Sequence, residues 1–400
     1  MRFSSLSRHL AARVSSICRY PYKIIKKRFP DRLSESDAMA AHHFSQAREL
    51  ITKVDLDGAL AHTLKAASLV DQSVDHRLIY RIGAALDALG ERDHGWELIS
   101  KAERIRTGAT REDWRGENIS DRTLLVEWRR GDIGIGIRSA GLVAHAARCA
   151  RRCIVLVEPR LIPLYRRTLE GVDVRSKEDD PATAFAEADV FVSFHTLAAL
   201  FGPGSQNAAP FLPLRPDREL VATFRAQYQN GSDTPLVGIS WSSATKKRQV
   251  PPLANWQTLL RSVPATYVSL QYGNVTAAVG QLRAATGAHI IEDQSVDQLV
   301  DMDRFAAQVA ALDAVVSIPN SIGHTAGALG TPSVAIIGNH VFNSKWARRE
   351  SGGRGWSNRT GWCPNMQLVH RQDRDWSMTM QEARFALEAM LRRVRQGIRS

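Results

Sequence analysis

The sequence lacks any run of about 18 or more apolar residues, which is the length that a transmembrane helix needs. It also has few cysteines, four in 400 residues, and no Cys or His pair follows Cys149 and Cys153 at zinc-finger spacing. We therefore expect no membrane-spanning helix, no bound metal, and free thiols in a reducing cytoplasm. No RNA- or DNA-binding signature is present, so nucleic acid is not an expected partner.

The first 30 residues lack Asp and Glu but carry eight Lys or Arg residues. Their apolar residues recur at three- and four-residue steps from Phe3 to Ile17, which places them on one helical face. Residues 1–34 are interpreted as a basic amphipathic leader on an anionic membrane surface, with a disordered basic tail or a transit peptide as alternatives. The net charge of +12 likewise favours anionic partners. The expected location is the cytoplasm, with peripheral attachment at the inner face of the membrane.

Residues 35–112 contain few helix breakers and follow helical periodicity. The stretches "DLDGALAHTLKAASLVD" and "ERDHGWELISKAERI" look like two copies of one helix, roughly 36 residues apart, with an antiparallel helix between them that Gly90 closes. This pattern resembles tetratricopeptide repeats, whose period is about 34 residues. An unrelated helical cap is the alternative.

Beyond Gly116 the sequence alternates strands with helices, in two tandem sections at 120–215 and 233–377. Continuous apolar strands separated by helices predict parallel sheets covered on both faces. One of the expected helices runs without a break from Ile135 to Cys149, and a last helix occupies 378–400. The fold class is α/β, with two Rossmann-like domains that bind ligands at the carboxyl ends of their strands, in the cleft between them.

The stretch "VVSIPNSIGHTAGALGTPSVAIIG" reads as a strand, a short helix and a second strand. Asn320 and Ser321 can cap the helix, and small residues such as Gly323 let its first turn approach a ligand. The exposed amides and the positive end of the helix dipole favour a diphosphate, to which His324 could donate a hydrogen bond. The alternative is that the polar residues only cap the helix and that His324 packs.

Several other residues follow strands where ligands are expected. Lys246, Lys247 and Arg248 come after the first strand of the second section and could reach the same phosphates, although they could equally form a solvated loop. Trp241 and Gln271 end strands on the cleft side, with core packing as the alternative for Trp241. His195 ends a strand of the first section, where a structural role is the alternative.

Four sets of residues resemble GT-B glycosyltransferases of the heptosyltransferase-like kind (family 9), in the version fused behind tetratricopeptide repeats. They are "DRFAAQVAALDAVVSIPNSIGHTAGALGTPSVAII", "LVGISWSSATKKR" with "YVSLQYG", "GWCPNMQLVHRQDRDW", and "RRGDIGIGIRSA". The resemblance covers residues 120–395. It implies metal-independent transfer of a sugar, in which a nucleotide-sugar is a substrate and no cofactor is required.

The same resemblance suggests Asp132 as the general base that deprotonates the acceptor. Arg129 and Arg130 adjoin it, and nearby cations lower a carboxylate pKa, so a turn-forming role beside Gly131 is the alternative. The expected acceptor is an anionic glycan, a lipid-linked sugar or a protein. Pro319 stands where the family usually has Asp, which favours a second hypothesis, a non-catalytic scaffold or nucleotide-sugar-binding module. A nucleotide-sugar epimerase is a further alternative.

Overall fold

The computed structural model describes residues 34–70, 73, 75–108, 113–128, 133–243, 249–338, 349, 356–372 and 375–397. The chain forms two compact units. The first contains residues 1–109 together with 349–355, and the second contains residues 110–348 together with 356–400. Sites predicted at Asp132, Lys246, Lys247 and Arg248, and residues 1–33 of the leader predicted over 1–34, lie outside the described residues.

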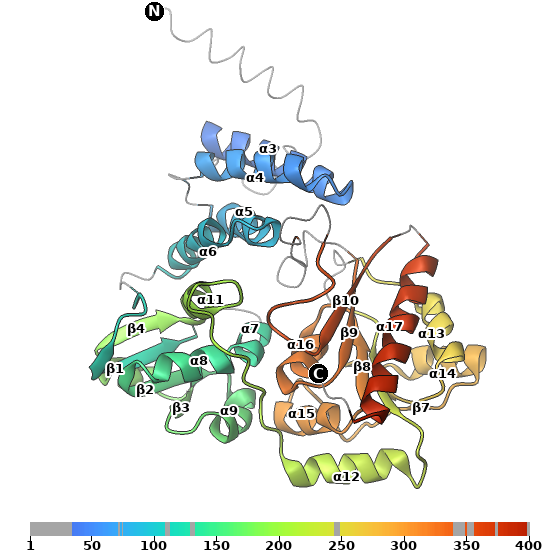
Figure 1. Ribbon diagram of the computed structural model, residues 1–400. Helices are drawn as coiled ribbons and strands as arrows, with labels where there is room; N and C mark the ends of the chain where they lie inside the picture. The colour runs from blue at the N-terminus through green and yellow to red at the C-terminus, as the bar shows by residue number, and fades with distance from the viewer. Residues whose placement is uncertain are drawn as a thin grey trace, which may run out of the picture. The chain divides into compact units, whose positions relative to one another are not determined.

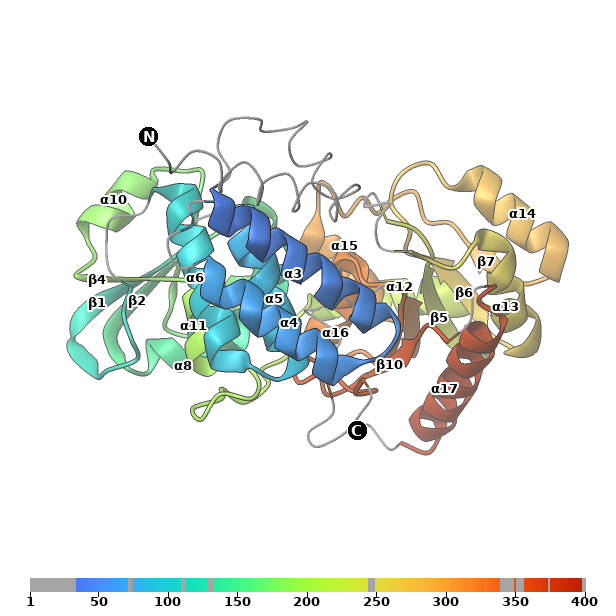
Figure 2. The same cartoon turned by 90° about the horizontal axis from the view of Figure 1, so that it is seen from above.

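The first unit consists of paired helices, and Figure 2 shows α3 beside α4 and α5 beside α6. Each begins at an acidic or hydroxyl residue; Ser34, for example, forms a reciprocal capping box with Asp37. Gly83 and Gly95 allow α5 and α6 to touch, because a Cβ on either would lie 2.6 Å from the carbonyl oxygen of the other. The bounds are α3 (Glu35–Thr52), α4 (Leu56–Leu69), α5 (His76–Leu89) and α6 (Arg92–Thr107).

The described part of the helical region expected over 35–112 forms two hairpins, α3 with α4 and α5 with α6. Buried aliphatic and aromatic side chains, among them Phe44, Ile79 and Leu86, recur at helical spacing along these helices. The resemblance to tetratricopeptide repeats stays a prediction.

The first sheet of the second unit has four parallel strands in the order β3-β2-β1-β4 (Figure 1). Its strands are β1 (Ile119–Glu127), β2 (Ala150–Val157), β3 (Asp173–Ser176) and β4 (Val190–Ser193). Its helices are α7 (Ile133–Arg138), α8 (Ala140–Ala147), η1 (Pro159–Leu161), α9 (Ile162–Thr168), α10 (Pro181–Ala186) and α11 (Phe194–Phe201).

The prediction of one helix from Ile135 to Cys149 was wrong, because α7 ends at Arg138 and α8 begins at Ala140. The carbonyl of Gly136 accepts hydrogen bonds from the Tyr165 hydroxyl at 2.6 Å and from the Ser139 amide at 3.2 Å. In a continuous helix that carbonyl would bond the amide of Ala140. The tyrosine contact, together with the tight turn at Ser139, breaks the helix.

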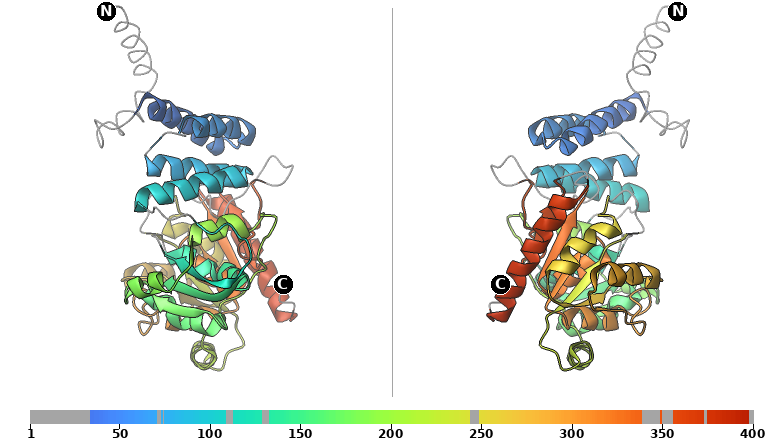
Figure 3. Two further views of the ribbon diagram at one scale, coloured as in Figure 1. Left: turned by 90° about the vertical axis from the view of Figure 1, so that its left-hand side faces the viewer. Right: turned by 90° about the vertical axis from the view of Figure 1, so that its right-hand side faces the viewer.

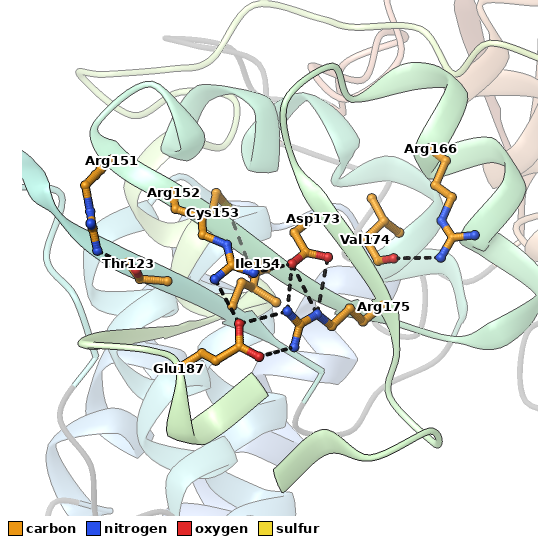
Figure 4. A network of polar contacts seen from close by, with 10 residues as sticks. All are labelled: Thr123, Arg151, Arg152, Cys153, Ile154, Arg166, Asp173, Val174, Arg175 and Glu187. Carbon is orange, nitrogen blue, oxygen red and sulfur yellow. Dashed lines mark hydrogen bonds and ion pairs between the residues drawn. The ribbon is translucent and has the colours of Figure 1, made fainter. Parts of the chain in front are cut away.

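A network of charged side chains lies across β2 and β3 (Figure 4). Arg152 pairs with Asp173 at 2.6 Å and with Glu187 at 2.8 Å, while Arg175 contacts both carboxylates at 2.8–2.9 Å. Hydrogen bonds from Arg175, and then from Arg152, hold the pKa of Asp173 below its usual value. All four side chains remain 25–44% exposed, so solvent screens these pairs.

The second sheet has six parallel strands in the order β10-β9-β8-β5-β6-β7. Its strands are β5 (Leu236–Ser240), β6 (Thr266–Ser269), β7 (Ile290–Ile291), β8 (Ala314–Ser317), β9 (Ser333–Ile337) and β10 (Met366–His370). Its helices are α12 (Arg218–Gln229), η3 (Leu253–Trp256), α13 (Gln257–Ser262), α14 (Thr276–Thr286), α15 (Met302–Ala310), α16 (Ser321–Leu329) and α17 (Ser377–Arg395).

Every residue of β5, β6, β8 and β9 is buried. Strands that are apolar throughout their length have both faces covered, as a parallel sheet between helix layers requires. Helix α17 runs along one face of this sheet and places Met380 and Leu387 in its core (Figure 3). The predicted α/β class with two parallel sheets is confirmed.

Candidate functional site

The second sheet reverses its strand order between β5 and β8. From β5 the chain builds outward through β6 and β7, then returns to the other side of β5 and builds through β8, β9 and β10. Ser240 and Ser317 are paired in register at the carboxyl ends of these two strands. In open parallel sheets, ligands bind outside the carboxyl ends at such a switch point.

Asn320 caps α16 at this switch point. Its Oδ1 accepts hydrogen bonds from the Gly323 amide at 3.0 Å and from the Ser317 hydroxyl at 3.1 Å. Its Nδ2 donates to the Ser240 hydroxyl at 2.8 Å. The side chain is 6% exposed and all of these contacts are within the protein. The predicted capping role is confirmed for Asn320, whereas Ser321 is the first residue of the helix. The Asn320 side chain therefore positions the first turn of α16.

Gln271 continues the network from the end of β6. Its Oε1 accepts hydrogen bonds from the Ser240 hydroxyl at 3.1 Å, the Trp241 amide at 3.2 Å and the Ser242 amide at 2.9 Å. Gln271 and Asn320 thus both bond Ser240, and the ends of β5, β6 and β8 are joined to the start of α16. The indole of Trp241 belongs to the buried core of this sheet. Core packing was the alternative interpretation of this residue.

Gln298, which the sequence did not single out, braces the same helix from the loop after β7. Its Nε2 donates to the Leu270 carbonyl at 3.2 Å, and its Oε1 accepts from the Ser321 hydroxyl at 3.3 Å. Its carbonyl accepts a hydrogen bond from Arg160, which follows β2 of the first sheet, at 3.0 Å. No local motif marks this residue, because its role depends on contacts from three separate segments.

His324 lies in the first turn of α16 and is 8% exposed. Its ring is thus mostly enclosed by protein. Gly323, beside it, gives its amide to the Asn320 cap. The amides that precede Gly323 and the positive end of the helix dipole remain the features of α16 suited to an anion.

A cavity of ≈ 410 Å³ adjoins the network at the carboxyl ends of β6 and β7. Its polar lining includes Gln271, Tyr272, Asn274, Glu292, Asp293 and Asp297. Burial raises the pKa of Asp293, but hydrogen bonds from Ser295 and Tyr228 lower it more, so the net pKa is below its usual value and the group is ionised at neutral pH. Such carboxylates can accept hydrogen bonds from hydroxyl groups.

The first sheet has its own switch point, between β1 and β4. Helix α7 follows β1, and α11 follows β4 with Ser193 as its cap. His195, in the first turn of α11, is 7% exposed and does not join the network around Asn320. Helix α7 packs against α16, so the elements that follow the central strands of the two sheets meet.

Among the described residues, no group of three or more His, Cys, Asp or Glu side chains is placed to hold a metal ion. Within the same part of the chain, no helix has the length and apolar character needed to cross a membrane.

No family model matches the chain. Among curated proteins it is similar to Protein FlbA of Caulobacter vibrioides, with 27% identity over 349 residues, covering 79% of this chain and 56% of that protein. The chain thus spans about half the length of this curated relative.

Among solved structures, the chain is similar to the ADP-heptose LPS heptosyltransferase II of E. coli, at a TM-score of 0.50 and 12% identity, covering 68% of this chain and 99% of that one. The second unit has a GT-B glycosyltransferase fold. A glycosyl transferase of family 9 from Veillonella parvula matches at a TM-score of 0.49 and 10% identity over 70% of this chain and 99% of that one. At 12% identity the likeness to the heptosyltransferase concerns the fold.

Proposed function

We propose that the chain transfers a sugar from a nucleotide-sugar donor to an anionic glycan, a lipid-linked sugar or a protein. The observation that carries the proposal is the start of α16, held at the switch point of the second sheet by Asn320, Gln271 and Gln298. Cleavage of a nucleotide-sugar leaves a nucleoside diphosphate, whose negative charge must be stabilised. Because hydrogen bonds already hold the start of α16 in place, its amides and its dipole need no rearrangement to stabilise the diphosphate.

The cavity beside Gln271 and Asp293 suits the nucleoside part of the donor. It adjoins the same network, and carboxylates at this edge of a Rossmann-like sheet can bind ribose hydroxyls. The diphosphate would then lie toward α16, with Lys246, Lys247 and Arg248 as further phosphate ligands. Their cationic side chains follow β5 directly in the sequence.

The acceptor would approach from the first sheet, where Asp132 precedes α7. Asp132 takes the proton from the acceptor hydroxyl as that oxygen attacks the anomeric carbon and the diphosphate leaves. Basic residues 1–30 would hold the chain near an anionic membrane, where lipid-linked acceptors are found.

Donor binding is tested by titrating the chain with ADP, GDP, UDP and their sugar conjugates in a calorimeter. Asn320→Ala removes the cap of α16, should cost about 1 kcal/mol of stability, and should weaken binding at least about tenfold. Asp75→Ala removes the cap of α5 in the first unit and is a matched control that should leave binding unchanged. If no nucleotide binds the unaltered chain, the proposal fails.

A nucleotide-sugar-binding module without turnover is a second candidate, favoured by Pro319 immediately before the cap. Asp132→Asn separates the two functions. For a transferase, it should abolish acceptor-dependent nucleotide release while donor affinity stays unchanged. A module binds the donor equally well before and after the substitution and releases no nucleotide in either case.

A further inference from the structure

A second cavity, of ≈ 710 Å³, lies at the amino ends of strands in the second sheet, on the side opposite to the carboxyl ends. Its lining includes Asp313 and Pro332, which immediately precede β8 and β9, and Met366, the first residue of β10. It is bounded by the first turns of α12, which is labelled in Figure 1, and by the last turns of α17. Helix α16 starts at the switch point and ends at this cavity, so the two places are about 13 Å apart along its axis.

Five arginines and one aspartate line the cavity: Arg215, Arg218, Arg225, Arg359, Arg393 and Asp313. Arg225 pairs with Asp313 at 2.9 Å, and Arg215 pairs with Glu170 at 2.7 Å. Within the described part of the chain, Arg218 and Arg393 pair with no carboxylate. The cavity therefore carries excess positive charge.

Neutralising helix ends accounts for Arg225 and Arg393 but not for Arg218. Helices α15 and α16 both end at the cavity, but the carbonyl of Ala311 already accepts from Arg225 at 2.9 Å and that of Gly330 from Asn365 at 2.6 Å. Arg393 lies in the last turn of α17, where a cation is favourable. Arg218 is the first residue of α12, where the helix dipole disfavours a cation, so a helix end does not explain its position.

The remaining wall is apolar and includes Leu214, Leu312 and Met390. A volume of this size is within the range of small-molecule sites, which lies at about 300–1,000 Å³. We propose that this cavity binds a small molecule that carries at least two phosphate or carboxylate groups on a partly apolar body. Arg218 and Arg393, from separate helices, bind the anionic groups. This site is distinct from the one proposed for the donor.

Calorimetric titration with citrate and with pyrophosphate at low ionic strength tests the proposal and separates carboxylate from phosphate recognition. At least one probe should bind, with an affinity that falls as salt is added. Arg218→Ala and Arg393→Ala should each weaken that probe roughly ten- to hundredfold, as expected for a lost charge-assisted hydrogen bond. Arg392→Ala, an exposed neighbour on α17 outside the lining, is the matched control and should change affinity less than about twofold.

Pyrophosphate could also occupy the start of α16, and Asn320→Ala distinguishes that event. Binding that Asn320→Ala removes and the arginine variants leave intact overturns the proposal. Absence of binding by both probes overturns it as well. So does binding confined to phosphatidylglycerol vesicles, which would assign the arginines to a membrane contact. Failure of nucleotides to bind in the calorimeter would leave a positive citrate result standing.

Discussion

In the first half of the second unit, the polar network of Figure 4 consists of charged side chains that are partly exposed. The network of the second sheet is uncharged and buried. The members of the charged network are in contact with solvent: Arg152 on β2, Asp173 and Arg175 on β3, and Glu187 at the end of α10. Asn320, Gln271 and Gln298 join strand ends to a helix and are at most 8% exposed. Buried polar groups are costly to leave unpaired, so the second network fixes its geometry much more strongly than the first.

The largest effect should come from Gln271→Ala. This change removes the acceptor of the Ser240 hydroxyl and of the Trp241 and Ser242 amides. Leaving buried donors unpaired should lower the free energy of unfolding by about 2–4 kcal/mol, measured by urea denaturation. Gln281→Ala, on the exposed side of α14, should change it by less than about 0.5 kcal/mol. Equal losses in the two variants would show that the network contributes little.

An intermediate effect is expected where the first sheet meets α7. A Cβ at Gly136 would lie 2.2 Å from the Trp128 ring, so Gly136→Ala should lower the free energy of unfolding by about 1–3 kcal/mol. Gly280 on α14 has no neighbour within 4 Å of such a Cβ. Gly280→Ala should therefore raise that free energy by about 0.5–1 kcal/mol. Thermal or urea unfolding measures both changes. A change of the same sign in the two variants would contradict the close contact between Gly136 and the Trp128 ring.

The smallest effect concerns the charged network of Figure 4. Since the folded-state pKa of Asp173 is lowered, its contribution is present above the unfolded pKa of about 4 and is lost as pH falls through the folded pKa. Asp173→Asn should cost at most about 1 kcal/mol at pH 7. It should also flatten the decline in stability as pH falls below about 5, followed by urea denaturation. Asp233→Asn, at an exposed position, should leave that decline unchanged. Identical pH profiles in both variants would show that the Asp173 network does not contribute to the pH dependence of stability.

The sequence predicted the second sheet more fully than its polar contacts. Continuous apolar runs such as Ala314–Ser317 identify buried parallel strands, and Asn320 before a small-residue helix identifies a cap; both are confirmed. The contact of Gln298 with Ser321 and the contact of Tyr165 with Gly136 join residues 23 and 29 positions apart. Local patterns contain no information on such pairs. Asp132, Lys246, Lys247 and Arg248 stay predictions.

A buried free thiol accompanies each sheet: Cys153 lies within β2, and Cys363 lies before β10, beside Gly327 of α16. Burial raises the pKa of both to about 12, so in the folded protein neither is present as the thiolate that reacts with alkylating agents. Each becomes reactive only when its own surroundings open. Among the described cysteines, Cys153 and Cys363 are the buried ones, and their two labelling rates compare directly how often each half of the glycosyltransferase fold opens.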